Sequence, residues 1–89
     1  MATIISHHGE EYHTHPNNGE AFTLDELQSV VGGYIELIHL PFGRIMVINE
    51  EGKLHGLPFN RAATEHAKAA LHNDVIVGTV LICAPGEIE

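Results

Sequence analysis

The histidine-rich start of the chain is one of two places where residue types point to chemistry. His7, His8, His13 and His15 fall within one short stretch. If residues 1–16 fold as a hairpin, His13 and His15 point to one face because side chains alternate along a strand, and His7 or His8 joins them across the turn. Three imidazoles on one face suit zinc or nickel. The stretch lacks cysteine and any established metal-ligand spacing, so a solvated polar strand is the alternative, and no cofactor is expected.

The second place is the sequence NEEGKLHGLPFNR, residues 49–61, which holds two of the four basic residues, Lys53 and Arg61. Asn60 is typical of a helix N-cap, and a helix N-terminus offers free N–H groups and a partial positive charge. The helix dipole disfavours a cation in the first turn, so Arg61 needs another reason to be there. A phosphate or carboxylate ligand is one explanation, and an ion pair with Glu65, four residues on, is the other.

Neighbouring residues complete a predicted anion site. Lys53 and His55 are placed to add hydrogen-bond donors, and two aromatic residues offer stacking surface. The expected ligand-binding residues are Lys53, His55, Asn60, Arg61, Tyr34 and Phe59.

Catalytic motifs are absent from the sequence. None of the hydroxyl or thiol residues lies in a nucleophile motif with a base placed beside it. The adjacent carboxylates Glu50 and Glu51 point apart in a strand or turn, and their solvation in a turn explains them. Cys83 lies in an apolar run without a basic neighbour, which indicates a buried structural cysteine. We therefore expect a noncatalytic protein.

Seven elements are needed to position these residues. A capping box at Thr23 and Glu26 begins a helix that Gly32 or Gly33 ends in the left-handed conformation. Apolar alternation and turn residues predict the remaining elements. We expect strands over 2–6, 10–16, 34–41 and 74–84, a further strand within 42–52 after a turn at 41–43, and helices over 23–33 and 61–72. The order β-β-α-β-β-α-β indicates an α+β fold with a mainly antiparallel sheet of about five strands.

Local details of these elements are also predicted. Residues 34–41 are apolar on both faces, which suits a central strand. Gly52 is free to adopt a positive φ in the turn after the fourth strand, and residues 53–58 run extended because Pro58 disfavours the helical region before it. Gly78 marks a bulge or bend in the last strand.

The length and net charge of the chain limit its possible functions. The chain has 89 residues, which indicates a single domain, and a formal net charge of −8 with histidine neutral. Such acidity argues against nonspecific nucleic-acid binding, which needs many lysines and arginines. No apolar run is long enough to span a membrane, and the N-terminus does not resemble a signal peptide, so a cytoplasmic location is expected. A domain this small buries more surface by forming a homodimer or higher homo-oligomer.

Several separate blocks carry a family resemblance. The run VVGGYIELIHLP, the segment RIMVINEEGKLHGLPFNRAAT and the closing DVIVGTVLI occur in order within residues 23–83. This pattern resembles small phage and mobile-element proteins grouped as domain of unknown function 3846. The resemblance implies a phage-linked accessory protein with no assigned reaction, located in the host cytoplasm.

Three functions are therefore open from the sequence. The first is a noncatalytic accessory protein that sequesters a nucleotide or another small anionic signal against host defence, in a pocket at a dimer interface. The second is an acidic protein–protein inhibitor of a host factor. The third is a metal-binding module that uses His7, His13 and His15.

Overall fold

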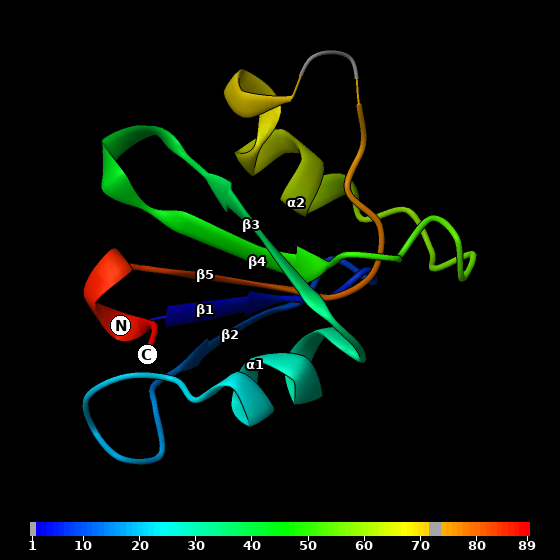
Figure 1. The fold of residues 1–89 in the computed structure, drawn as a ribbon. Helices are drawn as coiled ribbons and strands as arrows, with labels where there is room; N and C mark the ends of the chain where they lie inside the picture. Colours follow the sequence, from blue (N-terminus) through cyan, green and yellow to red (C-terminus); the bar gives the residue numbers. More distant parts are fainter. Residues whose placement is uncertain (1, 72–73) are drawn as a thin grey trace.

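A computed structural model describes residues 2–71 and 74–89 of the chain (Figure 1). The strands are β1 (Ala2–Ile5), β2 (Glu11–Thr14), β3 (Ile35–His39), β4 (Ile45–Asn49) and β5 (Val80–Cys83), and the α-helices are α1 (Leu24–Val31) and α2 (Arg61–His66). The strands form one sheet in the order β2-β1-β5-β4-β3, and every neighbouring pair is antiparallel. The predicted α+β fold and its element order are confirmed.

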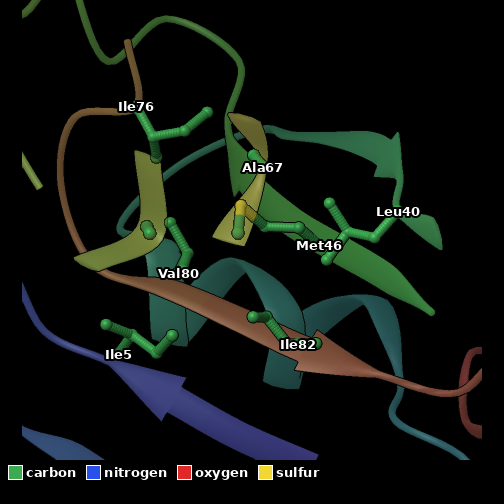
Figure 2. Close-up of a cluster of buried hydrophobic side chains, with 8 residues drawn as sticks. Ile5, Leu40, Met46, Ala67, Ile76, Val80 and Ile82 are labelled. Carbon is green, nitrogen blue, oxygen red and sulfur yellow. The ribbon is translucent and has the colours of Figure 1, made fainter. Parts of the chain in front are cut away.

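Each face of the sheet carries one helix and one buried cluster (Figure 1). Central strands supply both clusters because successive side chains point to opposite faces. The cluster under α1 contains Ala2, Phe22, Leu27, Val31, Val47, Leu81 and Cys83. The cluster under α2, part of which Figure 2 shows, contains Ile5, Leu40, Met46, Ala63, Ala67, Ile76, Val80 and Ile82.

Helix α1 begins as the sequence predicts. The Thr23 hydroxyl accepts a hydrogen bond from the Glu26 backbone N–H at 3.2 Å, and the Glu26 carboxylate accepts one from the Thr23 N–H at 3.0 Å. The same carboxylate also accepts from the Asn17 N–H, so it ties the preceding loop to the helix. Gly32 ends the helix with φ +84°. The capping box and the left-handed glycine are therefore confirmed.

These bonds predict how acid should affect stability. Hydrogen bonds from the Thr23 and Asn17 backbone N–H groups hold the pKa of Glu26 below its usual value. A lowered carboxyl pKa contributes stability above the unfolded-state pKa, and that stability is lost as pH falls through the folded-state pKa. We expect Glu26→Gln to reduce the loss of stability on acidification, measured by urea unfolding at a series of acidic pH values. Asp25→Asn, in the same helical turn, is the control, and equal pH slopes for wild type and Glu26→Gln would contradict the account.

The prediction that residues 34–41 form a central strand is wrong. β3 lies at the edge of the sheet and pairs only with β4 among the described residues. Its side chains are apolar toward both faces because Ile35 packs against the α1 cluster and Ile38 against the α2 cluster. The interior positions belong to β1, β5 and β4, with β5 at the centre. All four residues of β5 are buried.

The segment after β4 also differs from prediction, because residues 50–56 form turns rather than an extended run. The Leu57 N–H donates to the Gly52 carbonyl at 2.9 Å and closes this segment into a compact loop. Gly52 does not have positive φ; Gly56 does, at +67°. A Cβ on Gly52 would lie 2.8 Å from Val77 Cγ2, so glycine is needed there for close packing.

The last helix and the last strand are shorter than predicted. α2 ends at His66, and a 3₁₀ helix (Lys68–Ala70) follows; the prediction for residue 72 lies outside the described residues. β5 begins only at Val80, because the chain bends at Gly78, where φ is +78°. The predicted bend at Gly78 is confirmed.

Candidate functional site

A cleft of about 460 Å³ lies beside β3 and β4. One wall is the α2 face of these strands, and a second is the loop that follows β4. The third is formed by the end of the 3₁₀ helix with Leu71 and by residues 74–77. The lining residues are Glu36, Ile38, Ile48, Asn49, Glu50, Glu51, Gly52, Lys53, Leu54, Ala70, Leu71, Asp74, Val75, Ile76 and Val77.

Backbone hydrogen bonds hold two of these walls together. The Asn60 N–H donates to the Ile76 carbonyl at 2.9 Å, and the Gly78 N–H donates to the Pro58 carbonyl at 2.7 Å. Between them, Phe59 and Val77 form an isolated antiparallel bridge. Residues 49–61 therefore form one wall of the cleft. The main-chain contacts of residues 58–60 hold this wall against the segment before β5, and they do not depend on a ligand.

Asn60 is the anchor of this junction. Its side-chain carbonyl accepts from the Ala63 N–H at 3.0 Å and caps α2. Its side-chain amide donates to the Ile5 carbonyl at 3.0 Å and to the Gly78 carbonyl at 2.8 Å. The residue is fully buried. The predicted N-cap is confirmed, and the side-chain oxygen and amide of Asn60 are engaged in these three bonds. The place of Asn60 in an anion site stays a prediction.

The charge of the cleft is mainly negative. Its lining contains four carboxylates and one ammonium group. The ammonium of Lys53 forms an ion pair with Asp74. Lys53, together with the Val75 N–H, holds the pKa of Asp74 below its usual value. The remaining carboxylates belong to Glu36, Glu50 and Glu51, so the cleft has a net charge that repels anions and attracts cations.

Apolar side chains form the floor and part of the rim. Ile38, Ile48, Leu71 and Ile76 line the cleft and contribute to the α2 cluster. At the rim, Leu54 and Val75 have exposed fractions of 78% and 42%. An apolar floor with a few polar groups around it is the usual make-up of a ligand site. Here most of the charged groups are acidic.

The structure does not bring the predicted anion-binding residues together. Lys53 lines the cleft but is paired with Asp74. His55 lines a shallower neighbouring depression with Tyr34, and its Nε2 lies 3.8 Å from the Glu51 carboxylate. Arg61 is exposed on α2 and lines neither depression. Within residues 2–71 and 74–89 it forms no ion pair, so the predicted Arg61–Glu65 ion pair is not formed either.

The N-terminal hairpin forms as predicted, with Thr3 opposite His13 and Ile5 opposite Glu11. The rings of His7 and His8 lie 4.2 Å apart at the turn. In the part of the chain that the structure describes, no group of three or more histidine, cysteine or carboxylate side chains is arranged to hold a metal ion. The structure thus does not bring His7, His13 and His15 into one ligand set.

Cys83 is buried, as the sequence indicates, with an exposed fraction of 2%. Burial raises the pKa of its thiol to about 11. A thiol that is both covered and protonated at neutral pH is a poor nucleophile. This result agrees with the interpretation of Cys83 as a structural residue.

Most residues of the cleft have no local signal in the sequence, but Glu36 and Glu50 do. Once Pro41–Gly43 turns the chain, Tyr34 lies opposite Glu50, and the Glu50 N–H donates to the Tyr34 carbonyl at 2.9 Å. That register brings Glu36 and Glu50 to the same face, two residues apart along paired strands. No local pattern predicts the position of Asp74, because its contact with Lys53 depends on the tertiary fold after α2.

Comparisons with known proteins give a family and no activity. A family model described as Domain of unknown function (DUF3846) matches residues 2–89. Searches of curated proteins and of solved structures found no significant match. None of the helices in the described ranges is long and apolar enough to cross a membrane.

Proposed function

The chain belongs to the family described as Domain of unknown function (DUF3846), and from this premise we propose that it is a noncatalytic binding protein whose cleft receives a basic segment of a partner protein. The observation that carries the proposal is the combination, in one cleft, of an apolar floor with three carboxylates that pair with no lysine or arginine of the described residues. A lysine or arginine side chain matches both features, because its methylene stem packs on apolar surface while its head meets the carboxylates.

The rim favours a protein partner over a free small cation. Leu54 and Val75 expose apolar surface beside the cleft. A small cation inside the cleft leaves that surface in water, whereas a peptide or protein segment covers it. Charged residues around such a contact mainly raise the association rate and select the partner. This proposal develops the acidic inhibitor of a host factor that the sequence left open; the phage-linked origin stays a prediction.

Sequestration of a nucleotide or another anionic signal is less well supported. The acidic lining repels a phosphate, and the one lysine of the cleft is already paired with Asp74. Arg61 and His55 are exposed, so an anion site that they form by rearrangement stays a prediction. Calorimetry with linear and cyclic nucleotides, titrated separately from the basic probe, tests this alternative.

Reversing one charge in the cleft should weaken binding of a basic probe. The probe is a capped hexapeptide in which lysine and leucine alternate, and its counterpart carries glutamate in place of lysine. We expect calorimetry to detect the lysine peptide only, with salt-sensitive affinity, and we expect Glu50→Lys to lower that affinity about tenfold. Within the described residues the Glu50 carboxylate forms no hydrogen bond or ion pair that this change would break.

The matched control is Glu20→Lys. Glu20 lies in the loop before α1 and lines neither depression, and its substitution changes the net charge by the same amount. Equal losses for the two variants would show that only overall charge matters. No binding of the lysine peptide would remove the proposal, and binding of linear or cyclic nucleotides alone would favour the anionic alternative.

A further inference from the structure

The outer edge of β3 is a row of backbone groups that no described residue pairs with. The Tyr34 carbonyl accepts from the Glu50 N–H, and the Leu40 N–H donates to the Arg44 carbonyl at 2.8 Å. Hydrogen-bonding residues alternate along an antiparallel strand, so the even-numbered residues of β3 face β4. The N–H and C=O groups of Ile35, Leu37 and His39 therefore point outward.

The side chains do little to protect this edge. Natural sheets block free edges with charges, prolines or covering segments. β3 has one carboxylate, Glu36, and exposes Leu37 with an exposed fraction of 39%. The opposite edge strand, β2, starts with Glu11 and is followed closely by Pro16, which has no N–H. β3 is therefore the edge that is open to another strand.

We propose that a second copy of this chain pairs with β3 edge to edge, in antiparallel register about Leu37. In this register Leu37 lies opposite Leu37 of the second copy, and Ile35 lies opposite its His39. The backbone N–H and C=O groups of Ile35, Leu37 and His39 then form reciprocal hydrogen bonds with the second copy. Glu36 lies opposite Ile38 of the second copy, so no like charges face each other across the seam. The contact is self-complementary, as a two-fold interface must be.

Two exposed aromatic residues near the ends of β3 also support a second copy as the partner of this edge. Phe42 has an exposed fraction of 98% and a positive φ of 66°, which is uncommon for a residue with a bulky side chain. Tyr34 has an exposed fraction of 66%. In the register about Leu37, Leu40 lies opposite Tyr34 of the second copy. The turn at residues 41–43, which contains Phe42, then lies beside that tyrosine ring. The pairing thus covers aromatic surface that the monomer leaves in water.

This inference goes beyond the proposed binding function and can be tested apart from it. Leu37 shares its face of the sheet with Ile35, which packs against the α1 cluster, whereas the cleft lies on the α2 face. Glu36 and Ile38 line the cleft. In the dimer, the two clefts therefore lie on the same face of one continuous sheet and meet at the β3–β3 seam.

Opposite charges introduced at Leu37, which lies opposite Leu37 of the second copy, test the dimer. We expect sedimentation equilibrium of the full chain to show a monomer–dimer equilibrium, and Leu37→Glu or Leu37→Lys alone to raise the dimer dissociation constant about tenfold or more, because like charges then lie directly opposite. An equimolar mixture of the two variants should recover dimer, since the opposite charges meet in the heterodimer. Circular dichroism checks that both variants fold.

The same pair of substitutions at His13 is the matched control. By the register of the β1–β2 hairpin, in which the Ser6 N–H donates to the Glu10 carbonyl, His13 points its backbone groups to the other outer edge. His13→Glu and His13→Lys should leave the dimer unchanged. A monomeric wild type, or Leu37 variants that dimerise as well as wild type, would overturn the proposal. So would a mixture that dimerises no better than either Leu37 variant alone.

Discussion

Replacing Asn60 with alanine should lower the free energy of unfolding by about 3 kcal/mol, because the substitution removes a helix cap and two buried donors at once. The cap bond to the Ala63 N–H is lost, and the carbonyls of Ile5 and Gly78 each lose a donor in the interior. For a domain of this size the change corresponds to a fall in melting temperature of roughly 12–24 °C. Thermal and urea unfolding, followed by circular dichroism, measure it.

Two further variants separate the parts of this effect. Asn60→Asp keeps an oxygen to cap α2 but cannot donate to either carbonyl, so it should remain strongly destabilised at neutral pH. Asn18→Ala removes an exposed asparagine whose side chain accepts from Glu20 and Ala21, and it should cost much less. If Asn60→Asp were as stable as wild type, the buried donations would not matter and the account of this junction would be wrong.

The second large effect is expected for Gly78→Ala. Gly78 has φ +78°, and a Cβ there would lie 2.8 Å from Leu57 Cδ1, so the variant combines backbone strain with a steric clash. We expect a loss of about 2–4 kcal/mol, measured by urea unfolding. The clash falls on the contact that joins the loop after β4 to the segment before β5. Binding of the lysine peptide should therefore weaken together with stability.

Gly19→Ala isolates the backbone contribution. Gly19 has nearly the same φ, +77°, but a Cβ there meets no atom within 4 Å. Its loss should be about 1 kcal/mol, which is the cost of the left-handed conformation alone. In addition, Leu57→Ala should recover part of the stability of Gly78→Ala by removing the clashing methyl group. Equal losses for Gly19→Ala and Gly78→Ala would show that Leu57 does not restrict position 78.

Local sequence signals predicted the elements well because their causes are local. The spacing of Thr23 and Glu26 sufficed to begin α1, and Asn60 sufficed to begin α2. The apolar run over residues 74–84 predicted the last strand, and the structure places β5 at the centre of the sheet. The two apolar faces of residues 34–41 were misleading about position in the sheet, because a helix on each face buries residues of both faces even at an edge.

The candidate site was less predictable because it depends on distant contacts. Arg61 was included in the predicted anion site because the helix dipole disfavours a cation in the first turn. In the structure Arg61 is exposed and lies outside the cleft. Lys53 lines the cleft, and its ammonium pairs with Asp74. That pairing depends on how the chain returns after α2, which no local pattern specifies. The stretch 49–61 is a wall of the cleft, and its acidic residues rather than its basic ones give the cleft its charge.

The central claim is that the cleft binds a basic segment, and an NMR titration of the uniformly ¹⁵N-labelled chain with the lysine–leucine peptide tests it most directly. The account predicts shifted amide signals at residues that line the cleft, such as Glu36, Ile48, Gly52 and Ile76, and unchanged signals in the loop around Glu20. Shifts confined to the region of Arg61, or no shifts at peptide concentrations that saturate the calorimetric signal, would contradict it.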